Sequence, residues 1–479
     1  MADGAPRSFH GAAAVDVAGS ADVPGARRVA VIGGGVAGLV AARRLAGAGC
    51  STVVFEAGGR VGGQVHTRSV AGVPVDVGAE SLLLSAPPVR GLIETLGLGE
   101  GLVSARSWPT WIRRGRRLRR LPAGVGPAGP TRLRPLVRAG ILSPRGLLRA
   151  GVEPLVPRGS DRADPSVGAL LTRRFGRQVV ERLVDPLLGS LHAADVDRLS
   201  AAAVAPTLLT RLKRSGSLLR TARSAPPGPE FATLHGGLVG LVERLADEPG
   251  LRLRLSTPVR AIVATPAGYR LDGEHGPLTE VDAVVLATPA AATRHLLAGL
   301  VPDAAALLEH ATAAGVATVV AAYPATQRTA VPDVNGLLVP STSGLLLKAA
   351  TFLSNKWPHL SDAPAWLVRL SAGRSDDQRF AGLDDDELVA RLHRELAATV
   401  GLSEPPIEVI VQRWPATMPQ LEVGHLQRVG ELRRALAAHP RIRLAGAAFD
   451  GVGIHAAITS GNDVADGLLH DLLTEQGAT

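Results

Sequence analysis

The chain contains little cysteine, few aromatic residues and no long apolar run. Its single cysteine, Cys50, excludes an intramolecular disulfide and favours a reducing compartment, so we expect a cytoplasmic protein. Aromatic residues make up 3% of the 479 residues, and the core must therefore consist mostly of Leu, Val and Ala. No stretch of about 18 uncharged apolar residues occurs, so we expect no transmembrane helix.

The composition is typical of a globular protein with more than one lobe. Hydrophobic residues make up 46% and charged residues 20%, and a chain of this length is expected to form two or three lobes. The net charge of +9 suits nucleic acid, an anionic membrane or an acidic small molecule. Nucleic acid is disfavoured, because the arginines are scattered and no DNA-binding motif occurs. The densest run, from Arg113 to Arg120, is either a solvated loop or hairpin, or a surface that attracts an anionic substrate or membrane.

The N-terminal region superficially resembles an export signal. Arg27 and Arg28 precede an apolar run from Val29 to Ala42, as in a twin-arginine signal. The glycines within this run and the missing small-residue cleavage site argue against that interpretation. Residues 1–26 are small and polar, and we expect them to form a disordered extension.

The apolar run instead predicts the start of a nucleotide-binding unit. Residues 29–32 and 51–55 are short apolar strands, and residues 36–48 between them form a helix. This order is that of a βαβ unit. A buried strand at 441–446 and a helix at 456–473 have the same character, so we expect a discontinuous nucleotide-binding domain.

Three glycines between the first strand and the helix form a GxGxxG motif. Gly33 permits the tight turn, Gly35 leaves room for a pyrophosphate, and Gly38 allows the helix and strand to pack closely. The phosphates are then expected at the helix N-terminus, where free N–H groups and the dipole favour anions. Glu56 ends the second strand, and its carboxylate can accept hydrogen bonds from both ribose hydroxyls. The same carboxylate disfavours the 2′-phosphate of NADP.

The residues that follow resemble a known flavin signature. Residues 56–64 contain an ExxxRxGG string, which is similar to the second flavin signature of the amine oxidase superfamily. That group includes monoamine oxidases, phytoene desaturases and protoporphyrinogen oxidases. Residues 75–80, 283–289, 444–446 and 451–454 resemble its other flavin-contacting strings. The resemblance implies FAD, bound by Gly33, Gly35, Val36, Ala37, Gly38, Glu56, Ala57, Arg60, Gly62, Gly63, Gly78, Ala79, Glu80, Val259, Ala287, Gly446, Gly451, Gly453 and Ile454.

Within this superfamily the chain resembles the porphyrinogen oxidases. Strings at 183–189, 195–200, 233–238, 336–340 and 348–358 carry this resemblance. Members oxidise either protoporphyrinogen IX or coproporphyrinogen III, and the composition and the KWP segment are more similar to the coproporphyrinogen type. The resemblance implies a six-electron oxidation in haem biosynthesis, with O2 as acceptor and release of H2O2.

The resemblance also suggests residues that contact the tetrapyrrole substrate. The candidates are Gln64, Ser190, His192, Leu338, Lys348 and Leu370. The two leucines would sandwich the macrocycle, or they are ordinary core residues. The lysine, together with Lys356 and the arginine run, would attract the propionates, or these are surface charges. The histidine would accept a proton or contact a propionate, or it is structural.

Three residues depart from the family pattern. Ser190 replaces a glycine, His192 replaces a tyrosine, and His455 replaces a proline. These departures leave open a related amine oxidase or desaturase that acts on a secondary metabolite, although the scarcity of aromatic residues speaks against an amine oxidase. A flavoprotein that binds a porphyrin or a partner protein without turnover is a third, non-enzymatic alternative.

These observations together predict an α/β fold of several domains. A Rossmann-like FAD-binding domain is assembled from residues 27–91, 227–295 and 440–479. A mainly helical domain spans 92–226, and an α+β substrate-binding domain spans 296–439. We expect a monomer or homodimer that binds neither metal nor nucleic acid, and peripheral membrane contact is left open.

Overall fold

The computed structural model describes residues 26–126, 129–157, 164–219 and 230–476. These residues form two compact units. Unit 1 contains the described residues up to Val65, with Val239–His310 and those from Glu431 onwards. Unit 2 contains the described residues of His66–Leu238 and Ala311–Gly430. Residues 1–25 of the expected N-terminal extension lie outside the described residues.

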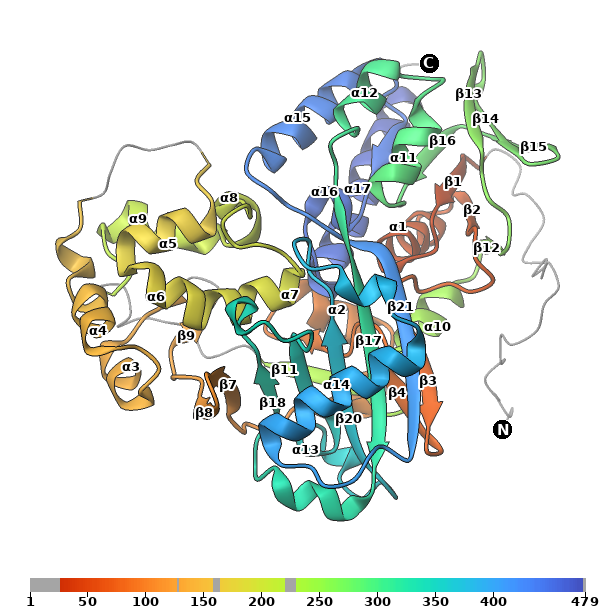
Figure 1. The fold of residues 1–479 in the computed structure, drawn as a ribbon. Coiled ribbons are helices and arrows are strands. Elements are labelled where there is room, and N and C mark those ends of the chain that lie inside the picture. The colour runs from red at the N-terminus through yellow and green to blue at the C-terminus, as the bar shows by residue number, and fades with distance from the viewer. Residues whose placement is uncertain (1–25, 127–128, 158–163, 220–229, 477–479) are drawn as a thin grey trace. The chain divides into compact units, whose positions relative to one another are not determined.

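Unit 1 is built on a five-stranded parallel sheet (Figure 1). Its strands, in spatial order, are β12 (Leu251–Arg254), β2 (Ser51–Phe55), β1 (Arg28–Ile32), β16 (Ala283–Leu286) and β22 (Ile442–Leu444). The central strands are almost wholly apolar, because a parallel sheet with helices on its faces is buried on both sides. The first βαβ unit and the return of the C-terminal segment to the same sheet are therefore confirmed.

Two helices of unit 1 pack closely against each other through a glycine. They are α1 (Val36–Gly47) and α17 (Ile454–Gln476). A Cβ atom at Gly461 would lie 2.5 Å from the carbonyl oxygen of Ala37, so a larger residue would force the helices apart. The unit also contains α10 (Val239–Ala246), β13 (Ala261–Thr265), β14 (Gly268–Gly273), β15 (Gly276–Val281), α11 (Ala290–Leu297), α12 (Pro302–Leu307) and α16 (Ala447–Asp450).

Unit 2 contains a seven-stranded mixed sheet. Its strands, in spatial order, are β21 (Glu408–Pro419), β17 (Ala313–Tyr323), β20 (Trp366–Ala372), β19 (Ala349–Phe352), β18 (Gly336–Leu338), β7 (Thr110–Arg114) and β8 (Arg117–Arg120). Helix α14 (Asp385–Val400) packs on one face of this sheet (Figure 1). Its Leu388, Leu392 and Leu396 recur every four residues and are fully buried, as an amphipathic helix requires.

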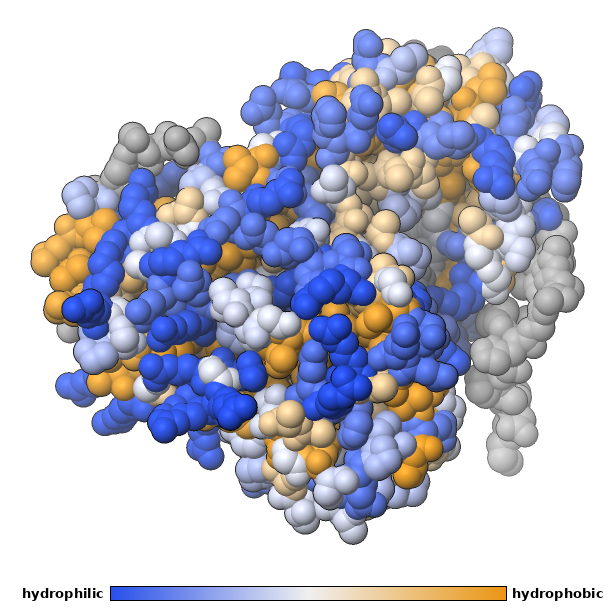
Figure 2. Space-filling view, viewed as in Figure 1, coloured by the Kyte–Doolittle hydropathy of each residue, from blue (hydrophilic) through white to orange (hydrophobic). Residues whose placement is uncertain are grey.

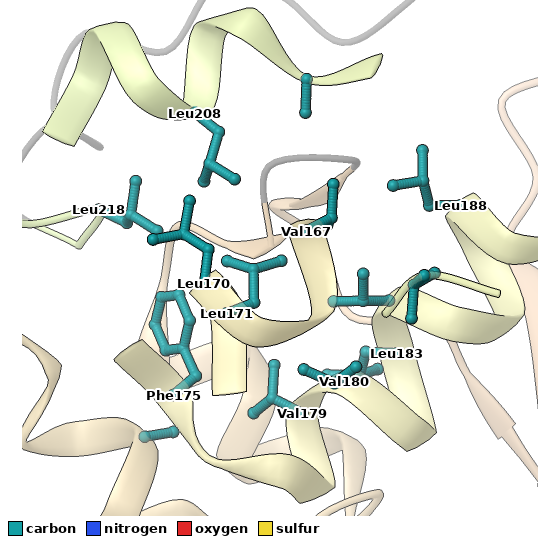
Figure 3. Packing of buried hydrophobic residues seen from close by; sticks show 14 of the residues in the cluster. Val167, Leu170, Leu171, Phe175, Val179, Val180, Leu183, Leu188, Leu208 and Leu218 are labelled. Carbon is teal, nitrogen blue, oxygen red and sulfur yellow. The ribbon is translucent and has the colours of Figure 1, made fainter. Parts of the chain in front are cut away.

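The helical part of unit 2 has its own apolar core (Figure 3). The elements that contribute most to it are α5 (Val167–Phe175), the π-helix η3 (Val180–Gly189) and α9 (Pro206–Ser215). Further helices are α3 (Leu133–Ala139), α4 (Pro144–Gly151), α6 (Arg177–Val179), α7 (Ser190–His192) and α8 (Ala201–Val204). Beside this core, the fully buried Arg174 donates from Nε to Glu153 Oε1 at 2.7 Å.

The segment 92–226 is less helical than the sequence predicts. Its first part forms the strands β6 (Leu102–Ser104), β7, β8, β9 (Val125–Gly126) and β10 (Gly129–Pro130). The arginine run therefore lies in the β7–β8 hairpin, and hydrophilic residues gather around it in Figure 2. The strands of this hairpin are rich in arginine on both faces, so they lack the alternation of apolar and polar residues from which a strand is normally predicted. No described helix is both long and apolar enough to cross a bilayer.

The remaining strands of unit 2 come from segments that the sequence assigns to the FAD-binding domain. They are β3 (Thr67–Val70), β4 (Val73–Asp76), β5 (Leu82–Leu83) and β11 (Phe231–Leu234), with the helices α2 (Pro87–Thr95) and α13 (Leu353–Lys356) nearby in the same unit. Compactness thus groups residues 66–91 and 230–238 with unit 2. Helix α15 (His425–Ala435) follows β21.

Candidate functional site

The glycine turn after β1 combines two crowded positions with one open position. A Cβ atom at Gly33 would lie 2.6 Å from the Ala287 carbonyl oxygen, and one at Gly38 would lie 2.0 Å from the Gly33 carbonyl oxygen. These two glycines are therefore required by packing. A Cβ atom at Gly35 would have no neighbour within 4 Å, and its φ of −72° suits any residue. Packing does not explain this glycine, but the space that a pyrophosphate needs does.

The N-terminus of α1 offers backbone donors beside that open position. The first intrahelical bond of the helix runs from Leu39 N to Gly35 O, so the amides of Val36, Ala37 and Gly38 precede the hydrogen-bonded ladder. No side chain caps this helix end. The free N–H groups and the helix dipole together form a site for an anion.

Glu56 lies at the end of β2 with its carboxylate held by two backbone amides. Its Oε2 accepts from Gly34 N at 2.8 Å, and its Oε1 accepts from Gly58 N at 2.7 Å. A carboxylate has about four acceptor positions, so both oxygens can still accept a further donor such as a ribose hydroxyl. Ala57 lies between these two contacts. Val259, another predicted FAD contact, lies two residues after Thr257, and the Thr257 N–H donates to Glu56 O.

The second glycine string folds back onto the first. Gly62 N donates to Gly34 O at 2.7 Å, and Gly35 and Gly62 form an isolated parallel bridge. Gly62 and Gly63 have φ values of +101° and +56°, which favour glycine. The Arg60 guanidinium donates to the carbonyl oxygens of Val61, Gly63 and Val65. Arg60 therefore holds the shape of this loop, a role that the sequence analysis did not predict.

The C-terminal residues that resemble flavin contacts, 444–446 and 451–454, also belong to unit 1, and Gly446 lies near the start of α1. Gly446 N donates to Ser460 Oγ at 2.8 Å, and a Cβ atom at Gly446 would lie 3.7 Å from Ala37 Cβ. Gly451 and Gly453, with φ of +115° and +109°, precede Ile454 at the start of α17. His455 is exposed in the first turn of this helix, and Gln64 is exposed in the loop before Val65. A second helix N-terminus thus belongs to the unit that carries the glycine turn.

The donors and spaces of unit 1 fit a dinucleotide. The open position at Gly35 and the uncapped end of α1 suit a pyrophosphate, and Glu56 suits the adenosine ribose. The residues of unit 1 that would hold FAD through these contacts are Gly35, the first residues of α1 and Glu56.

Unit 2 contains a buried carboxylate between two cations. Lys356 Nζ donates to Glu80 Oε1 at 2.6 Å, and Arg369 Nη1 lies 3.4 Å from Glu80 Oε2. Burial raises the pKa of Glu80, but the two cations more than offset this effect, so its pKa lies below the ordinary value. Arg369 also donates to Gly78 O at 2.7 Å. These contacts fix the segment Gly78–Ala79–Glu80, which the sequence assigns to the flavin.

A second buried ion pair stabilises the π-helix η3. Arg374 Nη1 lies 3.2 Å from Asp185 Oδ1, while Arg374 Nη2 donates to Ser190 Oγ at 3.2 Å. Asp185 Oδ2 also accepts from Ser341 N at 2.9 Å. Pro186 lies inside this helix and provides no N–H, and π-helical turns are frequent at functional sites. The predicted substrate contact Ser190 is thereby positioned by Arg374.

The other predicted substrate contacts lie in different surroundings of unit 2. His192 is buried, its Nδ1 has no hydrogen-bond partner among the described residues, and burial lowers its pKa to about 4. Leu338 is half-buried and packs against the helical core. Leu370 packs in the core under α14. Lys348 is buried rather than solvated.

Sequence reasoning missed the importance of Arg369 and Arg374. Arg369 lies in the mostly apolar strand β20, and Arg374 lies just after it. The signal was present, because Glu80 and Asp185 each stand among apolar residues and a buried carboxylate needs a cation. Pairing each acid with its arginine requires the fold, since the partners are 289 and 189 residues apart in sequence.

Comparison with known proteins agrees with this geometry. The family model described as flavin containing amine oxidoreductase matches residues 36–469. A coproporphyrinogen III oxidase from Mycobacterium leprae (strain TN) is 34% identical over 447 residues, which cover 91% of this chain and 96% of the relative. The chain belongs to the porphyrinogen oxidase branch of this family. It is an FAD-dependent oxidoreductase.

Two further relatives extend the similarity. A coproporphyrinogen III oxidase from Bacillus subtilis (strain 168) is 30% identical over 456 residues, which cover 91% of this chain and 97% of the relative. A crystal structure from Exiguobacterium sp. 255-15, assigned provisionally as a protoporphyrinogen oxidase, has a TM-score of 0.83 at 30% identity. The match covers 92% of this chain and 98% of that one. The expected flavoprotein fold is thus confirmed along nearly the whole chain.

Proposed function

We propose that this enzyme oxidises coproporphyrinogen III to coproporphyrin III in haem biosynthesis. The observation that carries the proposal is its match, along more than nine-tenths of its length, to relatives named for that reaction. The open cradle at Gly35 and the carboxylate of Glu56 support the cofactor that such a reaction needs. Protoporphyrinogen IX is the alternative porphyrinogen, and the provisional name of the Exiguobacterium relative motivates testing it.

The proposed reaction removes six electrons in three two-electron steps. Overall the macrocycle loses one C–H hydrogen from each of its four bridging methylenes and two of its four N–H hydrogens. In each step one methylene C–H bond gives up a hydride and one proton leaves, either from a pyrrole N–H or, after tautomerisation, from a remaining methylene carbon, so the ring gains one double bond. FAD, held by the residues of unit 1, would supply the hydride acceptor, and in this proposal O2 is the final electron acceptor and is released as H2O2. The balanced reaction consumes three O2 and releases three H2O2 for each porphyrin.

The protein's own groups have binding and positioning roles in this proposal. Ser190 and Leu338 are proposed to contact the macrocycle, with Gln64 near the flavin. His192 is proposed to lie near the substrate; burial lowers its pKa, which favours the neutral imidazole at this position. No strongly basic carboxylate is needed, because the proton can also leave to water.

A recruited substrate remains the second candidate. The departures at Ser190, His192 and His455 motivate a related oxidase or desaturase that acts on a secondary metabolite. Such an enzyme would bind FAD through the same unit 1 contacts but would not oxidise a porphyrinogen.

The test is aerobic turnover of the purified holoenzyme with coproporphyrinogen III and, separately, with protoporphyrinogen IX. Porphyrin fluorescence and H2O2 are followed together, and the spontaneous rate is measured with flavin-free protein. We expect faster formation of coproporphyrin than of protoporphyrin, with three H2O2 per product. If FAD is bound but neither rate exceeds the spontaneous one, the porphyrinogen assignment is wrong.

A further inference from the structure

Lys348 lies in a cavity within unit 2. It directly precedes β19, and its ammonium-bearing side chain is 8% exposed. The cavity has a volume of about 360 Å³. Its charged lining residues are the cations Lys348, Arg374 and Arg379 and the carboxylates Asp376 and Asp377. A lysine is seldom buried to this extent unless another group pairs with it.

No anion within the described residues pairs with this lysine. The Lys348 ammonium has no hydrogen bond or ion pair there, and the charged groups that act on it most are Arg374 and Arg369, both cationic. Burial and these two cations lower the pKa of Lys348 to about 7. Asp185 and Glu80 are already paired with the two arginines.

Of the three cations that line the cavity, Lys348 is the one without an ion pair among the described residues. Arg374 is neutralised by Asp185, and Arg379 by Asp377 at 2.6 Å. Asp376 also lines the cavity, but its side chain is exposed and water screens its charge. Lys348 is therefore a buried cation without an ion pair among the described residues, and such a group is costly unless it loses its proton or gains an anion. A single ammonium without an ion pair suits a monoanionic carboxylate better than a phosphate dianion.

We propose that this cavity binds a carboxylate, with Lys348 Nζ as the direct donor and Arg374 reinforcing the positive potential. An ammonium has three N–H donors and can approach a carboxylate oxygen from several directions. Arg374 also donates to Ser190 Oγ, so the cavity is linked to a residue that is proposed to contact the substrate.

The carboxylate has two conceivable sources. It belongs either to a propionate of the porphyrinogen, which rests on the proposed function, or to a free carboxylate that binds independently. Coproporphyrinogen III has four carboxylates and protoporphyrinogen IX has two, so the two substrates differ in the group that the cavity would recognise.

The chain contains only three lysines, Lys213, Lys348 and Lys356, which makes a direct test practical. Holoenzyme labelled with 13C at lysine Cε would give few NMR signals, and K348M assigns the one of interest. K213M is the matched control, because Lys213 is exposed on α9. We expect the Lys348 signal to titrate near pH 7 and to shift upward by more than one pH unit when propionate or coproporphyrin III is added.

Steady-state kinetics then distinguish the two sources. If the substrate supplies the carboxylate, K348M raises KM for coproporphyrinogen III about tenfold to hundredfold, affects protoporphyrinogen IX less and leaves kcat almost unchanged. If propionate shifts the lysine signal but the KM ratio stays constant, the ligand is a free carboxylate. The absence of any shift with both probes would overturn the carboxylate site. The NMR result does not depend on turnover, so an enzyme inactive with both porphyrinogens would refute the proposed function and not this site.

Discussion

Replacement of Gly35 by alanine separates a cofactor role from a structural one. At Gly33 and Gly38 a Cβ atom would collide with neighbouring backbone atoms. At Gly35 a Cβ atom would have no neighbour within 4 Å, and the backbone angles are compatible with alanine. G35A should therefore fold normally but should bind FAD poorly. G38A is the matched control, because its methyl group would lie 2.0 Å from the Gly33 carbonyl oxygen.

The expected magnitudes follow from this geometry. Replacing glycine by alanine at a position with compatible backbone angles stabilises the folded state by about 0.4–1 kcal/mol. Because alanine is a poorer N-cap residue than glycine, the same change destabilises the start of the helix by a similar amount. The free energy of unfolding of apo-G35A should thus stay within about 0.5 kcal/mol of wild type. A displaced pyrophosphate loses up to about 2 kcal/mol of helix-dipole interaction and about 1.5–3 kcal/mol for one charged hydrogen bond. A net loss of about 2–4 kcal/mol weakens FAD binding about 30- to 1000-fold.

The assay has two parts. FAD is titrated into apoprotein and the quenching of flavin fluorescence gives Kd, while urea unfolding of the apoprotein gives stability. G38A should lose about 1–3 kcal/mol of stability through overpacking. Wild-type FAD affinity in G35A would refute the placement of the pyrophosphate over Gly35. A loss of apoprotein stability in G35A equal to that in G38A would show that this glycine is structural.

Three further changes test other parts of the two units. E56Q should weaken FAD binding about 10- to 100-fold in the same titration. The single amide oxygen of Gln cannot accept hydrogen bonds from Gly34 N and Gly58 N and also from the ribose hydroxyls. Unchanged FAD affinity would show that Glu56 does not contact the cofactor. R174M should lower the free energy of unfolding by about 3–5 kcal/mol, because Glu153 would remain buried without its partner, and a loss below 1 kcal/mol in urea unfolding would contradict this. Burial raises the pKa of Asp76 from 3.8 to about 6, so its contribution to stability is complete below pH 4 and is lost as pH rises through 6. The free energy of unfolding of D76N should therefore vary with pH by about 3 kcal/mol less than that of wild type. If the curves of unfolding free energy against pH run parallel for D76N and wild type, the pKa of Asp76 is not raised.

The sequence predicts the cofactor-binding unit well because its signals are local. The strands β1 and β2, the helix between them and the glycines all lie within about 30 residues, and each glycine has a separate steric or binding reason. The loop role of Arg60 was not predictable in the same way. Its bonds to three carbonyl oxygens depend on how residues 61–65 turn, and this turn is a property of the folded loop.

The charged pairs of unit 2 show where local signals end. Glu80 and Asp185 are visible in the sequence as acids among apolar residues, but their arginines come from β20 and the turn after it. Only strand pairing brings them together. The same applies to Lys348, which the sequence presents as one of several basic residues and which the fold places in a cavity, without an ion pair among the described residues.

The two leucines expected to sandwich the macrocycle illustrate how strand register decides function. Across the three strands, Leu338 is in register with Ala349 and with Ser371. Leu370 is in register with Ala350, so it is displaced by one residue from the row that contains Leu338. Side chains alternate across a sheet, so Leu338 and Leu370 lie on opposite faces. The α14 face, which contains Leu370, is filled by the helix, while Arg369 lies on the same face as Leu338 and reaches the segment assigned to the flavin. Substrate contacts should therefore be sought by mutagenesis on the Leu338 face, with L370A expected to reduce stability by about 2–5 kcal/mol as a core truncation. A selective rise in KM for L370A at unchanged stability would instead show that the α14 face opens to the substrate.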